Sequence, residues 1–135
     1  MPWSNSDKEL SLLLAYRPPQ PPSQEGGNTG KLCDILKNLS GDSVIIGDIN
    51  LPGISWEPTQ SDAAGSEFLE TVNDMFMVQH VDFPTHDSGS TIDLVVSSSA
   101  ELVSGVKSVG KLGSSDHVEL WVEVCGPIKL SLIHI

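Results

Sequence analysis

The sequence SVIIGDIN, at residues 43–50, combines a short apolar run with an aspartate and an asparagine placed just beyond it. A β-branched run that ends in glycine predicts a buried strand leading out to a turn. Asp48 and Asn50 are poor strand formers, so we expect a carboxylate and a carboxamide at the edge of a sheet. When this segment is considered alone, an ordinary Asx turn is the simpler interpretation.

Composition limits the chain to one domain or part of one. It has 135 residues, of which 39% are hydrophobic and 19% charged, as in a protein with a globular core. No apolar run is long enough to span a bilayer, and the N-terminus lacks the profile of a signal peptide. Cys33 and Cys125 have no metal-type spacing. We therefore expect a reduced, intracellular chain.

The charge balance argues neither for nor against a particular fold, but it limits the partners. Seven basic and eighteen acidic residues give a net charge of −11 with histidine neutral. Lys and Arg normally hold phosphate backbones, and this chain has no basic patch, so charge alone does not indicate nucleic acid. Clustered carboxylates do fit a metal-assisted phosphoesterase, in which a divalent cation supplies the positive field.

The first half of the chain has the pattern of a strand, a helix and a second strand. Residues 10–16 (LSLLLAY) form a short apolar run that predicts a buried strand, and residues 20–30 predict a loop rich in Pro and Gly. Residues 29–39 predict a helix whose apolar positions share one face, namely Leu32, Ile35, Leu36 and Leu39. The strand at residues 43–46 follows.

The second half alternates helix and strand patterns. We expect a loop at 51–60, a helix at 65–76 with Phe76 on its buried face, a short strand at 77–81, a loop at 83–90, and strands at 91–96, 103–109 and 117–124. In the last of these, four apolar residues alternate with Glu119, Trp121 and Glu123, as in a half-buried strand. Together these elements predict a mixed α/β fold.

Two further polar groups occur at predicted strand ends. Asp93 lies inside the apolar run TIDLVV, where a carboxylate is costly to bury unless it is paired; an exposed position on the strand is the alternative. Asp116 and His117 precede the last strand, and a surface turn is the alternative for this pair. Adjacent residues cannot form the aligned series of a serine-protease triad.

In this order, GDIN at 47–50, STIDL at 90–94 and GSSDH at 113–117 resemble the motifs of the endonuclease/exonuclease/phosphatase superfamily, which includes deoxyribonuclease I and the apurinic/apyrimidinic endonucleases. Further segments are similar to the endonuclease domain of non-LTR retrotransposon polyproteins. These are AYRPP at 15–19, GDINLPGISW at 47–56, QHV at 79–81, FPTH at 83–86 and LGSSDH at 112–117. The resemblance covers residues 10–124 and defines a partial domain at 10–126.

The resemblance implies a fold, a reaction and a partner. The fold would be the C-terminal part of a four-layer α/β/β/α sandwich, as in deoxyribonuclease I. The reaction would be phosphodiester hydrolysis dependent on Mg²⁺ or Mn²⁺, which nicks target DNA and leaves a 3′-hydroxyl to prime reverse transcription. The partner of the complete parent domain would be DNA, in the nucleus, with neither a membrane nor a protein partner inferred.

The resemblance also implies roles for individual residues. His117 would act at the scissile phosphate, either as general base for water or by stabilising the phosphorane, and Asp93 would bond to it and orient it. Asp48 and Asn50 would position the water and a phosphate oxygen. The chemistry needs such a mixture, because a hard cation binds carboxylate oxygens and an in-line displacement needs a base and hydrogen-bond donors around a pentavalent centre.

Two more residues complete the implied site. Asp116 would lie near the divalent cation, and Tyr16 would contact the phosphate. The family begins with a strand that carries an Asn and a strand-helix unit that carries its main metal-binding Glu, whereas nine residues precede Leu10 here and Glu9 adjoins the strand. We therefore expect weak or no hydrolysis from this chain alone.

The last residues break from the preceding pattern. Residues 130–135 (LSLIHI) look like a translated sequencing adapter, so we interpret 127–135 as a tail from outside the family and exclude His134 as a ligand. A genuine apolar tail is the alternative. His80 and His86 are interpreted as polar residues at loop boundaries.

Two other functions fit the same motifs. One is a phosphoesterase of the same superfamily that acts on a phospholipid or an inositol phosphate; the segments 16–19 and 51–56 favour the endonuclease instead. The other is a non-catalytic retroelement remnant, against which the intact polar residues argue.

Overall fold

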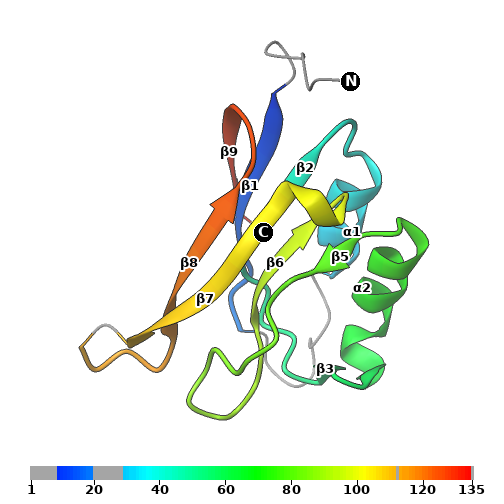
Figure 1. The fold of residues 1–135 in the computed structure, drawn as a ribbon. Helices are drawn as coiled ribbons and strands as arrows, with labels where there is room; N and C mark the ends of the chain where they lie inside the picture. Colours follow the sequence, from blue (N-terminus) through cyan, green and yellow to red (C-terminus); the bar gives the residue numbers. More distant parts are fainter. Residues whose placement is uncertain (1–8, 20–28, 112, 135) are drawn as a thin grey trace.

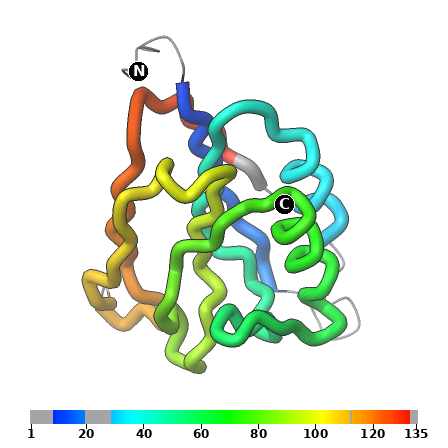
Figure 2. The backbone as a smooth tube through the Cα atoms, turned by 45° about the vertical axis from the view of Figure 1, so that its right-hand side comes forward, coloured from blue at the N-terminus to red at the C-terminus, as the bar shows by residue number. Residues whose placement is uncertain are grey.

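A mixed five-stranded sheet with helices on one face and a pair of long strands on the other forms the molecule (Figure 1). The structure is a computed structural model and describes residues 9–19, 29–111 and 113–134. Its mixed α/β architecture agrees with the fold class expected from the sequence. Figure 2 shows the same three layers after a turn of 45°.

The sheet has the strand order β5-β6-β2-β1-β9. Strand β1 (Leu10–Tyr16) lies parallel to both β2 (Ser43–Asp48) and β9 (Ile128–His134), whereas β6 (Asp93–Ser97) runs antiparallel to β2 and to β5 (Val78–Gln79). The end of β2 and the start of β6 therefore lie side by side at the same end of the sheet.

The helices α1 (Thr29–Lys37) and α2 (Ala63–Asp74) cover one face of this sheet. Alternate strand residues point toward them, because successive side chains of a strand face opposite ways. The resulting core contains Leu13, Ala15, Ile45, Leu94 and Val96 from the sheet and Leu32, Leu36, Phe68, Leu69 and Val72 from the helices.

The antiparallel strands β7 (Val103–Lys111) and β8 (Val118–Val124) cover the opposite face. A short 3₁₀ helix, η2 (Ala100–Leu102), connects β6 to β7. Leu10, Val44 and Val95 of the sheet form a second core with Val103 and with partly buried residues of β8. The half-buried alternation predicted for β8 is confirmed, since Glu119, Trp121 and Glu123 are exposed.

The strand-helix-strand pattern of the first half is confirmed. Strand β1 has the predicted bounds, helix α1 ends at Lys37 rather than at residue 39, and β2 continues past residue 46 to Asp48. Residues 20–28 of the predicted loop lie outside the described residues.

The loop predicted at 51–60 is wrong in part, because it contains a small hairpin. Strands β3 (Ile54–Trp56) and β4 (Thr59–Ser61) pair in an antiparallel manner. The Ser55 hydroxyl donates to the carbonyl of Pro58, and the Thr59 hydroxyl donates to that of Trp56. Strands of three residues are too short to give an alternating pattern, and the prolines and glycine of this segment conceal them.

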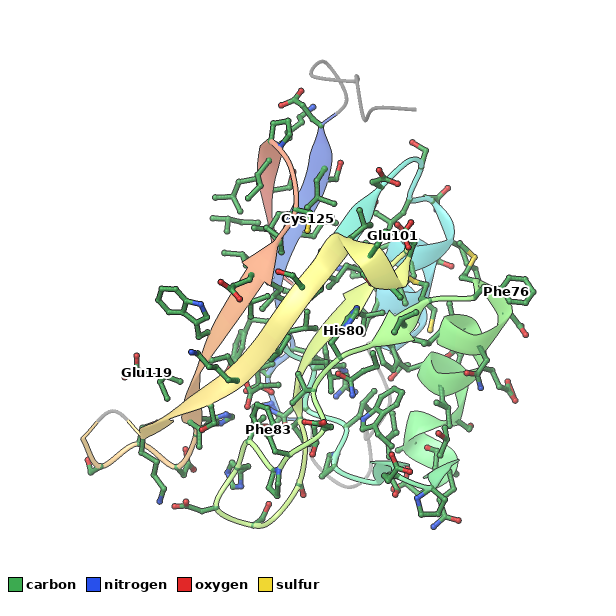
Figure 3. The ribbon with its side chains drawn as sticks, viewed as in Figure 1. Phe76, His80, Phe83, Glu101, Glu119 and Cys125 are labelled. Carbon is green, nitrogen blue, oxygen red and sulfur yellow. The ribbon has the colours of Figure 1, made fainter. Side chains whose placement is uncertain are left out.

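The prediction that Phe76 is buried on the second helix is wrong. Helix α2 ends at Asp74, and Phe76 has a φ of 55°, in the left-handed region. The Met77 amide donates to the Val72 carbonyl, which closes the helix end and takes Phe76 out of the helical register. Its side chain is 86% exposed and projects away from the molecule (Figure 3).

Residues 128–134 form strand β9, with Leu12 paired to Leu130 and Leu14 to Leu132. The leucines of β9 are exposed, as is Leu14. The fact that residues 128–134 form a strand does not show whether this segment belongs to the family domain. The interpretation of residues 127–135 as a tail from outside the family therefore stays a prediction. Neither α1 nor α2 has the length and apolar character that a bilayer-spanning helix needs.

We predict that Asp62→Ala destabilises the protein by about 1 kcal/mol, because the Asp62 carboxylate caps α2 by accepting from the Gly65 amide at 3.0 Å. Asp62→Asn keeps an acceptor at this position and should cost much less. Urea unfolding followed by circular dichroism measures both changes, and equal losses in the two variants would contradict the capping role.

Candidate active site

Three adjacent strand ends bring three of the predicted site residues side by side. Tyr16 ends β1 and pairs in register with Asp48 at the end of β2, and Asp48 pairs with Asp93 at the start of β6. Residues paired in register point to the same face of a sheet. All three side chains therefore share the face that β7 and β8 cover, at its open end.

Gly47 lets β2 approach β1 immediately before Asp48. A Cβ atom at this position would collide with the backbone carbonyl oxygen of Ala15, so any larger residue would push the two strands apart. Two residues later, Asn50 has a φ of 56°, in the left-handed region that Asn tolerates better than most residues.

Arg17 supports the turn that follows β2. It is fully buried, and its Nη1 atom donates to the carbonyl oxygen of Asn50 at 3.0 Å and more distantly to that of Ile49 at 3.5 Å. Its backbone amide donates to the carbonyl of Asp48 at 2.8 Å. The positions of Asp48 and Asn50 are thus fixed from the β1 side.

Thr85 joins the two segments that carry Asp93 and His117. Its buried hydroxyl oxygen accepts from the amides of Ile92 and Asp93, each at 3.1 Å. Its carbonyl accepts from the amide of Val118 at 2.9 Å. One residue therefore holds the start of β6 and the start of β8 in fixed relation.

His117 lies between the aspartates. Its Nδ1 atom is 2.7 Å from Asp93 Oδ2, and its Nε2 atom is 3.7 Å from Asp48 Oδ2 and 3.8 Å from Asp116 Oδ1. The side chains of Asp48 and Asp93 are each 17% exposed, whereas Asp116 is 62% exposed. Asp93 is therefore a largely buried partner of the imidazole and does not point to solvent.

The environment shifts two pKa values in this cluster. Burial, followed by the charge of Asp93, raises the pKa of Asp48 to about 6, against the opposing effects of His117 and the Asn50 amide. Burial lowers the pKa of His117, but the hydrogen bond with Asp93 and the charges of the three aspartates outweigh it and raise that pKa overall. Each group thus influences the protonation of the other, so the two titrations are coupled.

His86 also lies in the cluster, which sequence reasoning did not predict. Its Nε2 atom is 3.1 Å from Asp116 Oδ2, and its ring meets that of His117 edge-on, with centroids 5.0 Å apart. The FPTH segment at 83–86 was the available signal, but a histidine after a loop proline gives no indication of its partner. His80 instead bonds to Ser97 Oγ at 2.7 Å, at the opposite end of β6 from Asp93 (Figure 3).

Two groups of side chains can hold a metal ion within the described part of the chain. One comprises Asp48, Asp93 and His117, and the other His86, Asp116 and His117. Asp48 Oδ1 is buried and has no hydrogen-bond partner among the described residues. A buried carboxylate oxygen without a partner is costly, and a cation is one group that would satisfy it.

Comparison with known protein families gives a match over most of the chain. A family model described as endonuclease-reverse transcriptase matches residues 10–120, which is more than half of the chain. The match contains each strand end described above. No curated protein matches the chain.

We predict that Gly47→Ala destabilises the protein by about 3 kcal/mol, because its Cβ would overlap the Ala15 carbonyl. Gly110→Ala is the matched control, with a φ of 90° and no atom within 4 Å of an added Cβ, so it should cost about 1 kcal/mol. Urea unfolding measures both. Equal losses would show that backbone strain, rather than the contact with β1, determines the need for Gly47.

We predict that Asp48→Asn makes the folded protein more stable above pH 6. The pKa of Asp48 is raised from 3.8 to about 6 on folding, so the folded state binds its proton more tightly than the unfolded state does. Ionisation therefore opposes folding, and this penalty grows as pH rises from about 4 to about 6 and then stays constant, at about 2–3 kcal/mol.

Unfolding free energies measured in urea at pH 4, 5, 6 and 7 test this prediction. The gain from Asp48→Asn should be near zero at pH 4 and largest at pH 6 and above. Asp34→Asn, which changes an exposed carboxylate on α1, is the control and should change stability by less than about 0.5 kcal/mol. A gain that does not vary with pH would contradict the assignment.

Proposed function

Because the chain belongs to the endonuclease-reverse transcriptase family, we propose that its site hydrolyses phosphodiester bonds of DNA with the help of Mg²⁺ or Mn²⁺. Family membership implies a phosphodiesterase or nuclease. The observation that supports this site most directly is the imidazole of His117, which lies between Asp93 on one side and Asp48 on the other.

The proposed role of His117 follows from its two ring nitrogens. The neutral imidazole donates Nδ1–H to Asp93 Oδ2, which leaves the lone pair of Nε2 facing Asp48 and Asp116. Asp93 fixes this tautomer and the orientation of the ring. His117 can then accept a proton from water at Nε2 or, once protonated, donate to the charged phosphorane, and its raised pKa favours proton uptake.

The carboxylates fit a hard divalent cation. Asp116 is the proposed ligand, with Asp48 and its unsatisfied Oδ1 atom close to the same histidine. Carboxylate oxygens are the ligands that Mg²⁺ prefers. When bound, such a cation would neutralise charge on the scissile phosphate and supply the positive field that a chain of net charge −11 lacks.

The remaining roles are proposed from position. Asp48 and Asn50 would hold the water and a phosphate oxygen, and Tyr16, whose side chain is 44% exposed beside Asp48, would contact the phosphate. In the parent retroelement protein, which would act in the nucleus, the nick in target DNA would prime reverse transcription.

We also propose that the three layers form part of a four-layer α/β/β/α sandwich. The observed order of helices, five-stranded sheet and β7–β8 pair corresponds to three of these layers. Strands β7 and β8 would then belong to the second sheet, and the site would lie at the open end between the two sheets.

Nicking of supercoiled plasmid under single-turnover conditions, with protein in excess and Mg²⁺ present, tests the function. We expect slow nicking that stops with EDTA and falls by at least about 100-fold in His117→Ala, because the general base is lost. Glu119→Gln is the matched control, since it changes an exposed residue two positions away on β8.

Nicking that persists unchanged in His117→Ala would contradict the proposal. Rapid nicking at catalytic protein concentration would contradict the expected weakness of the isolated chain. Parallel assays with a phospholipid and an inositol phosphate separate the endonuclease from the other phosphoesterases, and hydrolysis of either in preference to DNA would overturn the assignment of substrate.

A further inference from the structure

We infer that His86 is a positioning residue that holds Asp116 in place for the cation and for His117. The inference rests on the proposed function, because it concerns the residue proposed as the metal ligand. Without a partner, a side chain as exposed as that of Asp116 would occupy several rotamers. His86 is the partner that the fold supplies.

Backbone hydrogen bonds fix His86 opposite His117. The two residues form an isolated antiparallel bridge. On either side of it, the Val118 amide donates to the Thr85 carbonyl and the Asp87 amide donates to the Asp116 carbonyl, each at 2.9 Å. Backbone hydrogen bonds therefore join the loop that carries His86 to the turn that carries Asp116.

The surroundings of His86 select its tautomer. The backbone amide of Ser88 lies 3.0 Å from Nδ1 of His86, and an amide N–H can only donate. The Ser88 hydroxyl oxygen lies 2.9 Å from the same nitrogen, and a hydroxyl can donate as well as accept, so it is compatible with an acceptor at Nδ1. In the neutral ring, Nδ1 is therefore the acceptor, and the hydrogen is carried by Nε2.

That hydrogen points at Asp116. Nε2 of His86 is 3.1 Å from Asp116 Oδ2, so it donates to this oxygen and leaves Oδ1 directed toward His117 Nε2 at 3.8 Å. Each oxygen of Asp116 thus faces a different histidine. The arrangement resembles the outer partners of metal ligands in general, whose loss typically weakens metal affinity by about 10–100-fold.

A double-mutant cycle on Mn²⁺ affinity tests the inference, with free Mn²⁺ measured by electron paramagnetic resonance. His86→Phe keeps an aromatic ring against His117 but removes the N–H, and it should weaken binding by about tenfold. His86→Gln, whose amide can donate at similar reach, should restore most of the affinity. His80→Phe is the matched control and should leave the affinity unchanged.

The double variant shows how His86 acts. If His86 works through Asp116, then Asp116→Asn combined with His86→Phe should bind no more weakly than Asp116→Asn alone. A further tenfold loss in the double variant would overturn the inference, because His86 would then act independently, for example as a ligand. An unchanged affinity in His86→Phe would also overturn it.

The ring nitrogens provide a readout that does not depend on metal. Nitrogen-15 spectra of histidine-labelled protein should show the Nε2–H tautomer for His86, with its Nε2–H proton shifted by Asp116→Asn. A wild-type chain that binds no Mn²⁺ would contradict the proposed function. In that event, the Nε2–H tautomer would still support the positioning contact, and the Nδ1–H tautomer would overturn it.

Discussion

The structure depends on the register of β2 against β6, which places Asp48 opposite Asp93 where these two strands terminate, at one end of the sheet. Burial, followed by repulsion from the charge of Asp93, raises the pKa of Asp48 to about 6. His117 relieves this repulsion by lying between them, with one ring nitrogen toward each. The same contacts that make the imidazole a proposed base thus also make its position favourable.

The surrounding chain holds this unfavourable arrangement in place. Gly47 allows β1 and β2 to approach closely, Arg17 binds the carbonyl groups of the following turn, and Thr85 binds the amide of Asp93. Each contact uses a backbone atom, so none competes for the carboxylates themselves. The free energy that folds the two cores therefore maintains a site that is locally destabilising, as is common where function requires unpaired polar groups.

Much of the fold could be predicted because its elements have strong local patterns. Strand β1 has the bounds that its apolar run predicts, and the alternation of β8 corresponds to its exposed and half-buried residues. The hairpin of β3 and β4 could not be predicted, since three-residue strands give no period. Phe76 was misassigned because it is itself in the left-handed conformation, which the pattern does not reveal, and the helix ends before it.

The candidate site was predictable as a set of residues but not as a set of contacts. Polar residues that interrupt apolar strands stand out along the chain, so Asp48, Asp93 and His117 could be identified from the order of the motifs. Whether these side chains touch depends on the register of the strands and on how β8 lies over the sheet. Both bring together residues that are at least 24 positions apart in the sequence. His86 shows the difference most clearly, because its partner Asp116 is 30 residues away and no local pattern connects them.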